Sequence, residues 1–570
     1  MPEEVLISPG VVAIENDQSF VTQQPVQAGA AIIGPTVKGP VNIPTLVTTY
    51  SEYVNKFGTT FLSGSNTYSY FTSISAYNYF KNGGTSLLVT RVVSGSFTPA
   101  SSSAIYDSGS LNNVFVLETL SEGKMMNNTG TLNPDGTLFS GSADNVRWQI
   151  VSPNTASGTF NLVIRRGDDS TNSPTVLESW GPLSLDPFSS NYIEKVIGNQ
   201  VENIAQDGSD YYLQLTGSYT NNSTYVRVKQ VNITTPNYLD NSGNPKPQYT
   251  ASIPLAASGT FGAALGDILP ATVGEYYENA GSTVSQGIPA SEYNVPIYLL
   301  SNKDAYRFNF ISTPGLTLQN HSSQLTLLNS VCQDNGNSLL VLDLVIYGQN
   351  LSTVAGQSTG LDSSYSTTYW PWLQTVDPST GQKVWVPAST MIPGVYAFND
   401  NAAEPWYAPA GTNRGVISNA TMAERYLTQT NRDTLYEANV NPIATFPNTG
   451  VTVFGQKTLQ KKASALDRVN VRRLLIELKN YITQVADTLV FEQNTTATRN
   501  NFLLQVNPYL SSVQQRQGLY SFRVVMDETN NTPTVIDNNQ LVGAIYLQPT
   551  KTAEFIYLTF NVLPSGVVFG

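Results

Sequence analysis

The sequence has very few of the residues that carry out catalysis. It contains one histidine, His321, and one cysteine, Cys332, in 570 residues. A Ser–His–Asp or Cys–His system would have to be built on His321, and Asp343 is the partner we considered for it. His321 lies in LQNHSSQ, where we expect the start of a helix and a polar surface position. Zinc sites need three or four closely spaced His, Cys or acidic ligands, so we expect no enzyme, no catalytic residues and no metal.

Phosphate-binding and adhesion motifs are incomplete. No GxGxxG follows a strand pattern, and Gly455-Gln456-Lys457-Thr458 has glutamine where a phosphate loop needs glycine, so it predicts a turn. Arg166-Gly167-Asp168 spells the tripeptide read by integrins, but it lies between two strand-like runs, where Gly and Asp favour a hairpin turn. We therefore expect no cofactor.

Charge is also scarce, at 12% of the residues, and the net charge is −12. Nucleic-acid binding needs clustered Lys and Arg, so no nucleic-acid partner is expected. One cysteine cannot form an intrachain disulfide, which fits a reducing compartment. The acidic start Met1-Pro2-Glu3-Glu4 does not resemble a signal peptide, and the most apolar run, at 338–347, is too short to span a bilayer. We expect assembly in the cytoplasm of the producing cell and no direct membrane insertion.

What the chain does contain is apolar and turn-forming sequence. Hydrophobic residues make up 40%, beside 42 Gly, 32 Pro and 31 Tyr. This composition predicts a β-rich chain of about three domains with a neutral polar surface. Such a surface loses little hydration energy on contact, because few charges are desolvated. It suits a protein that buries much of its surface against copies of itself.

The pattern along the chain predicts a mixed, multidomain α+β protein. Strand–helix–helix–strand signals over 26–93 begin an α/β layer, which resumes near residue 296. Between them lie short alternating runs with Ser-, Asn- and Gly-rich turns, which predict an inserted all-β region that ends in a loose stretch near 240–290. The aromatic and Pro-rich residues 361–430 predict long ordered loops with short strands. The expected divisions are a 1–25 arm, an α/β domain from 26–93 and 296–430, a 94–295 outer insertion, a 431–550 α+β domain and a 551–570 arm strand.

Two segments near the end of the chain have clear periodicity. Residues 466–490 carry apolar side chains at three- to five-residue steps, which predicts an amphipathic helix. In EFIYLTFNV, Ile556, Leu558, Phe560 and Val562 share one face at a period of two, which predicts a strand. An apolar terminal strand aggregates unless a partner sheet receives it, so we expect it to pair with a neighbouring copy.

Distinctive blocks of sequence are spread over most of the chain. AGAAIIGPTVKGPVNIPTLVTTYSEYVNKFG lies near the start, TTYWPWLQTVDPSTGQKVWVPASTMIPGVYAFND with Ala408-Pro409-Ala410-Gly411 lies in the middle, and VTVFGQKTL and VNVRRLLIELKNYI follow. These blocks, of which the middle one is the most specific, resemble the tail sheath proteins of contractile injection machines such as contractile-tailed bacteriophages. Phe454 stands where the family has tryptophan, and Lys457 where it has arginine. Residues 94–295 match only in patches, as the family's variable outer part.

The resemblance implies a subtilisin-like α/β domain with an all-β outer insertion, an inner C-terminal domain and strand-exchanging arms. It implies a subunit that polymerises helically around a tail tube and contracts from a metastable extended state to deliver a genome. Its partners would be other copies, the tail tube protein, and baseplate and tail terminator proteins, in the virion. Arg472 and Lys479 are candidates to face the tube. The residues expected to exchange strands are Val11, Val12, Ala13, Ile14, Phe555, Ile556, Leu558, Phe560 and Val562.

Two other classes of protein have similar composition. A surface-layer or capsid-like lattice protein is also acidic and rich in Tyr, Asn and Ser, but a surface-layer protein would carry a secretion signal. A secreted glycan-binding protein or hydrolase would need a carboxylate pair framed by aromatic residues, and no such pair stands out. Electron microscopy of the purified protein separates the three, because they form tubes, sheets and monodisperse particles respectively.

Overall fold

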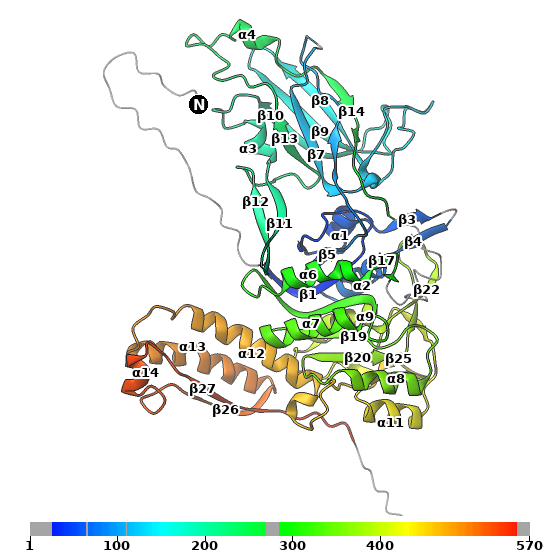
Figure 1. Cartoon of the computed structure of the whole chain (residues 1–570), viewed down its shortest axis with the longest axis vertical. Coiled ribbons are helices and arrows are strands. Elements are labelled where there is room, and N and C mark those ends of the chain that lie inside the picture. The colour runs from blue at the N-terminus through cyan, green and yellow to red at the C-terminus, as the bar shows by residue number, and fades with distance from the viewer. Residues whose placement is uncertain (1–25, 64–65, 110, 209, 269–283, 556–570) are drawn as a thin grey trace, which may run out of the picture.

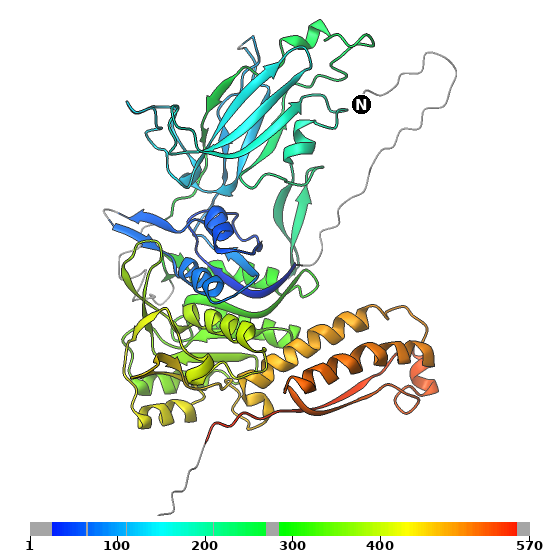
Figure 2. The same ribbon diagram turned by 180° about the vertical axis from the view of Figure 1, so that it is seen from behind.

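A computed structural model of the chain describes residues 26–63, 66–109, 111–208, 210–268 and 284–555. The β-rich outer region and the α/β body follow one another along its long axis, and a helical hairpin with a small sheet lies beside the part of the body farthest from the outer region (Figure 1). The view from behind shows the same arrangement (Figure 2). The mixed multidomain α+β fold expected from the sequence is confirmed.

The body is built on an eight-stranded sheet whose central strands are parallel. Its strands are buried on both faces and rich in Val, Ile and Leu, as parallel strands between helical layers must be. The strand order is β2 (Thr45–Val47), β5 (Leu87–Arg91), β1 (Val26–Gly34), β18 (Tyr306–Thr317), β19 (Leu339–Asp343), β20 (Ser366–Trp370), β24 (Asn441–Phe446) and β25 (Gly450–Val453).

Helices cover both faces of this sheet and complete two apolar cores. α2 (Phe71–Lys81) and α9 (Ala388–Ala402) pack together on one face. α6 (Asn294–Leu300) and α7 (Ser322–Asn335) cover the other. The first of the two helices expected over 26–93 is α1 (Tyr50–Phe57), where the Thr49 side chain accepts a hydrogen bond from the Glu52 amide, as an N-cap residue does.

The helix α9 corrects the expectation of loops and short strands over 361–430. Every residue from Ala388 to Ala397 is buried, so the helix is apolar all round and leaves no 3.6-residue period to detect. Pro393 inside it also argues against a helix in sequence terms. Packing on both sides outweighs that local preference, because α9 contacts both α2 and the strands β18, β19 and β20 of the sheet.

The outer region is a sandwich of two four-stranded antiparallel sheets. Phe115 and Phe160, one from each sheet, stack with ring centroids 5.7 Å apart in its core. One sheet contains β10 (Val176–Ser184), β9 (Thr159–Arg166), β8 (Val146–Asn154) and β14 (Ala257–Gly259). The other contains β13 (Val226–Val231), β7 (Phe115–Glu122), β6 (Pro99–Ser102) and β15 (Phe261–Gly262).

The expectation of a loose stretch near 240–290 is therefore partly wrong within its described residues, 240–268 and 284–290. β14 and β15 are edge strands of the two sheets, and the Phe261 side chain is fully buried between them. These strands are only three and two residues long, too short to show an alternating pattern.

The far end of the chain forms a helical hairpin on a two-stranded sheet. α12 (Val469–Asp487) confirms the helix expected over 466–490, and α13 (Thr496–Gln515) runs beside it. β26 (Leu519–Val525) pairs with β27 (Ala544–Pro549) and packs on α13. A separate apolar cluster holds these elements together. We call these four elements, with α14 (Pro533–Asp537), the C-terminal module.

The body's sheet extends beyond the boundary expected at residue 430. β24 and β25 come after that point yet form the last two strands of the eight-stranded sheet. Ile443 and Val453 are fully buried in the body's core. The C-terminal module separates from the body only at α12, whose Val469 and Ile476 still contact the body's core.

Candidate assembly interface

The last described residues are held to the body at a charged anchor centred on Glu554. Arg468, which precedes α12, donates from Nε to Glu554 Oε1 at 2.8 Å and from Nη2 to Oε2 at 3.0 Å. Gln456 Nε2 donates to Oε1 at 3.0 Å, and the Tyr436 hydroxyl donates to Oε2. Four donors from three separate stretches of the chain therefore hold one carboxylate, and we call this set the arm anchor.

The electrostatics of the arm anchor favour the charged carboxylate. Burial alone would raise the pKa of Glu554, but the hydrogen bonds from Tyr436, Arg468 and Gln456 hold it below its usual value. Burial and the adjacent carboxylate raise the pKa of Tyr436, so its hydroxyl remains a donor. Lys457 lies 4.0 Å from the centroid of the Tyr436 ring, where a cation contacts the negative face of the π-system.

A groove of about 540 Å³ lies beside the arm anchor. α11 (Gln429–Glu437) forms one wall, and Phe454 with Gly455 forms another. Phe555 borders the groove, 67% exposed, with its ring edge-on to Tyr436 at 6.3 Å. A large aromatic side chain in this position remains available for contact with another chain.

The small sheet of the C-terminal module is incomplete by ordinary standards. Among the described residues, β26 and β27 pair only with each other. A two-stranded sheet is marginally stable alone and presents unpaired N–H and C=O groups along its outer edges. α13 packs against β26 of this sheet.

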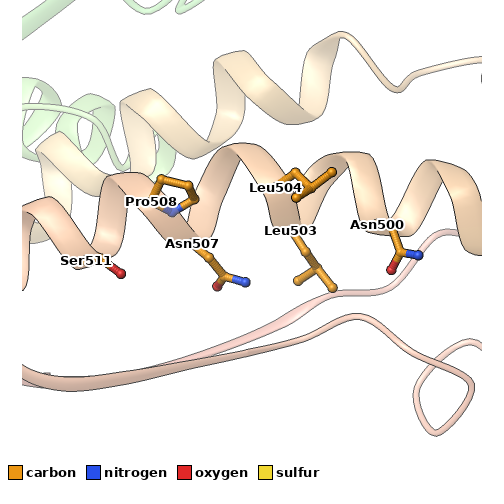
Figure 3. Close-up of a pocket in the computed structure, with 6 residues that line it drawn as sticks. All are labelled: Asn500, Leu503, Leu504, Asn507, Pro508 and Ser511. Atoms are coloured by element: carbon orange, nitrogen blue, oxygen red, sulfur yellow. The ribbon is translucent and has the colours of Figure 1, made fainter.

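A second groove, of about 510 Å³, runs along α13 (Figure 3). Leu503 and Asn507 point from the helix toward the strands below it, while Leu504 lies on the opposite side. Leu504 is 72% exposed. The lining residues are Asn500, Leu503, Leu504, Asn507, Pro508 and Ser511. With two leucines and a proline beside two amides and a hydroxyl, the groove suits a mixed peptide surface.

The residues expected to exchange strands can be located only in part. Phe555 is described and exposed, at the end of the arm anchor. Val11, Val12, Ala13 and Ile14, and likewise Ile556, Leu558, Phe560 and Val562, lie outside the described residues. The arm anchor itself was not expected from the sequence. Its one local signal is Glu554, an acidic residue directly before an apolar run.

The two residues expected to face a tube lie close together but differ in exposure. Arg472 is 3% exposed, because its guanidinium stacks on Tyr365 at 3.9 Å and donates to Ser364 O at 3.1 Å. Lys479 is exposed, with Nζ 3.0 Å from the Tyr365 hydroxyl. Lys479 therefore presents the accessible charge, while Arg472 is held within the subunit.

The histidine considered for catalysis is buried, and its expected surface position is wrong. His321 is 1% exposed, because its Nδ1 accepts the Thr317 amide at 3.1 Å and folds the ring back against the end of β18. The Asp343 carboxylate accepts from Ser389 N at 3.0 Å and from Ser389 Oγ at 2.5 Å. That aspartate joins the end of β19 to the first turn of α9.

The other motifs have structural roles. The Arg166 guanidinium pairs with the Asp168 carboxylate at 2.5 Å within the turn after β9, so the tripeptide bonds to itself. Within the part of the chain that the structure describes, no three His, Cys, Asp or Glu side chains are grouped to hold a metal ion. No helix of that part is long and apolar enough to cross a bilayer.

Comparison with known proteins identifies the family. Residues 298–459 match the phage tail sheath protein central domain, and residues 461–563 match the phage tail sheath C-terminal domain. The tail sheath protein of Vibrio phage KVP40 is 32% identical over 314 residues, which cover 50% of this chain and 46% of that protein. The tail sheath protein of Enterobacteria phage T4 is 36% identical over 224 residues, covering 39% of this chain and 34% of that protein.

The chain thus spans less than half the length of these curated relatives. The crystal structure of the sheath tail protein from Listeria innocua superposes with a TM-score of 0.51 at 10% identity, covering 92% of this chain and 96% of that one. At this identity the likeness shows the fold alone. The two family matches cover the second half of the body and the C-terminal module, and on that ground the chain belongs to the phage tail sheath family.

Proposed function

We propose that this protein is the structural subunit of a contractile tail sheath. In this proposal it polymerises helically around a tail tube and contracts from a metastable extended state, which drives the tube through the host envelope for genome delivery. The arm anchor carries the proposal, because it fixes the point from which an apolar strand leaves the subunit. The family matches at 298–459 and 461–563 support it.

Strand exchange is the proposed link between subunits. We infer that the strand beginning at Ile556 adds to an edge of the β26–β27 sheet of a neighbouring copy, with its apolar face on the α13 groove. About five backbone hydrogen bonds at ~1 kcal/mol each, and four apolar side chains at roughly 1.5–3 kcal/mol each, give a link of order 10 kcal/mol before entropy costs. A contact of this kind is heterologous and does not close, so it generates an open helix of subunits.

The parts of the subunit take separate roles in this proposal. The parallel sheet with helices on both faces supports a subtilisin-like body without subtilisin chemistry, since His321 and Asp343 are both buried. The sandwich is the outer insertion, and the C-terminal module is the inner domain that faces the tube, with Lys479 as the accessible charge. Residues 1–25 form the second arm. Baseplate and tail terminator proteins are the proposed partners at the two ends of the sheath.

Contraction requires two packings of the same subunits, with the extended one metastable. Weak polar contacts between bodies exchange during the change, while the arm links persist. The proposed setting is the virion, after assembly in the host cytoplasm.

Negative-stain electron microscopy of the purified protein tests the assembly. We expect hollow tubes without added nucleotide or metal. Flat sheets would favour a lattice protein, and monodisperse particles at high concentration would refute self-assembly.

Removal of the arm residues tests the mechanism. A chain that ends at Phe555 keeps the arm anchor and lacks only the proposed exchange strand. It should melt like the full chain and remain monomeric. Intact tubes from this chain would refute strand exchange. A collapsed melt would show that the strand completes its own subunit's sheet.

A further inference from the structure

Among the described residues, the outer region contacts the body in two separate places, the first of which also includes the packing of Met125 and Ile268 against the apolar cluster around Val37. One is the junction where the chain passes between them: Arg91 Nη1 donates to Gly39 O at 2.6 Å and to Glu122 O at 2.9 Å, and Lys38 pairs with Asp144 at 3.2 Å. The second is a ribbon of two strands, β11 (Val201–Asp207) and β12 (Asp210–Thr216), which reaches from the sandwich to the body (Figures 1 and 2). An attachment at two points resists rotation that one point alone would allow.

The ribbon is held firmly where it leaves the sandwich. Asn199 Oδ1 accepts the amides of Ser218 at 3.0 Å and Tyr219 at 2.9 Å. Asn221 does the same for the Gln200 amide at 3.1 Å and donates to the Gln200 carbonyl at 2.7 Å. Gly217 has φ 99°, and a Cβ there would lie 2.4 Å from the Asn199 carbonyl oxygen. Side-chain amides and a required glycine therefore fix the direction in which the ribbon projects.

The contact of the ribbon with the body is small and aromatic. The Tyr211 ring stacks on the Tyr298 ring of α6, with centroids 5.5 Å apart and planes 11° from parallel. Leu213, two residues on, packs against the body's second core cluster. Tyr212, which points to the other face of the ribbon, is 44% exposed. The ribbon therefore docks through one face.

The ribbon is not part of either sheet of the sandwich. Among the described residues, β11 and β12 pair only with each other, and most of their residues are at least partly exposed. An isolated two-stranded ribbon is marginally stable in water. Its order then depends on the stack with Tyr298 and on the packing of Leu213.

We propose that the β11–β12 ribbon is a releasable strut that sets the orientation of the outer region relative to the body. While Tyr211 stacks on Tyr298, the sandwich is held at two points and has one orientation. When the stack opens, the sandwich turns about the Arg91 junction. The strut belongs to the free subunit, so the proposal stands or falls independently of sheath assembly.

Hydrogen exchange and fluorescence energy transfer on the full chain test the strut. For orientation, dyes are placed on Ser242→Cys in the sandwich and Thr483→Cys on α12, both exposed, while Cys332 is fully buried and does not compete for the dye. With Tyr211→Ala we expect protection of the ribbon amides to fall about three- to tenfold, the loss of one aromatic pair. We also expect the distribution of transfer efficiencies to broaden.

Three variants make the result specific. Tyr211→Phe keeps the ring and should behave as the unsubstituted chain, and Tyr212→Ala removes a tyrosine of the same strand from the undocked face and should change neither readout. Tyr298→Ala removes the stack from the body side and should reproduce Tyr211→Ala. An unchanged efficiency distribution in Tyr211→Ala and Tyr298→Ala overturns the proposal, whether or not ribbon protection falls. So does equal broadening in Tyr212→Ala.

Discussion

The arm anchor makes a quantitative prediction about the root of the exchange strand. Glu554→Gln preserves the shape of the side chain but removes the charge that Arg468 meets through two hydrogen bonds of 2.8 and 3.0 Å. Hydrogen bonds to charged groups contribute about 1.5–3 kcal/mol. The pair is partly exposed, at 25% and 18% of the side chains, so the lower half of that range applies. A loss of about 1.5–2 kcal/mol multiplies the population of the detached root by about ten- to thirtyfold.

Limited trypsin digestion measures that population. Lys551 is exposed, and cleavage after it releases residues 552–570, a product resolved by mass spectrometry. Cleavage requires the flanking segment to detach, so its rate follows the opening equilibrium when closing is fast. The control is Glu528→Gln, an acid of the same module that is 75% exposed and 3.6 Å from Arg499.

The expected result is cleavage at Lys551 about ten- to thirtyfold faster in Glu554→Gln and unchanged in Glu528→Gln. The pKa of Glu554 is held below its usual value, so the anchor is complete above the ordinary glutamate range and is lost as pH falls through the lower, folded-state pKa. Equal cleavage rates in all three proteins at neutral pH would refute the anchor as a determinant of the arm's root.

Three further predictions concern the body, the sandwich and the tube-facing surface. Burial raises the pKa of Asp343 to about 7, so its contribution to stability is greatest below the unfolded-state pKa and is lost as pH rises through 7. Asp343→Asn should therefore raise the free energy of unfolding by up to about 4 kcal/mol at pH 8 and by less at pH 5. The exposed Asp304→Asn is the control and should show no such trend. Phe261→Ala should lower the free energy of unfolding of the sandwich by about 3–5 kcal/mol, as calorimetry measures, whereas shortening the exposed turn at 241–243 should leave the melt unchanged. A larger loss of stability from the shortened turn than from Phe261→Ala would contradict the assignment of β15 to the sheet. Lys479→Glu should weaken co-sedimentation with tail tubes about fivefold at low salt without changing the melt, and undiminished binding would remove Lys479 from the proposed tube contact.

Elements with a strong internal period could be predicted from the sequence. The helix expected over 466–490 is α12, because its apolar positions repeat at helical spacing along one side. The second strand expected over 26–93 is β5, which lies in a run rich in β-branched residues that follows Gly83 and Gly84. In both segments, local preference and tertiary environment require the same structure.

Elements whose form depends on distant residues could not be predicted. α9 is buried all round, so its sequence shows no amphipathic pattern. β14 and β15 are strands only because β8 and β6 provide an edge for them. His321 is buried because the backbone of Thr317 folds over it, an interaction that no spacing rule indicates.

The arm anchor shows the same limit at the candidate site. Glu554 meets Tyr436, Gln456 and Arg468, which precede it by 118, 98 and 86 residues. The sequence predicts an apolar strand in the residues after Phe555, which lie outside the described part of the chain, because period-two alternation is local. It gave no indication of the anchor, because the anchor exists only after the body has folded.

The position of the anchor determines what an exchanged strand can transmit. A link between subunits is only as strong as its weaker end. An exchanged strand that binds its neighbour by order 10 kcal/mol therefore joins two subunits only while its root stays attached to its own subunit. The structure places a bidentate ion pair and two further hydrogen bonds at that root, while contacts between exposed polar surfaces contribute roughly 0–1 kcal/mol each. In the proposed sheath, the polar contacts between bodies therefore break before the arm link does when the subunits slide. Under this proposal, strand exchange from the arm anchor keeps neighbouring subunits joined while their bodies change packing.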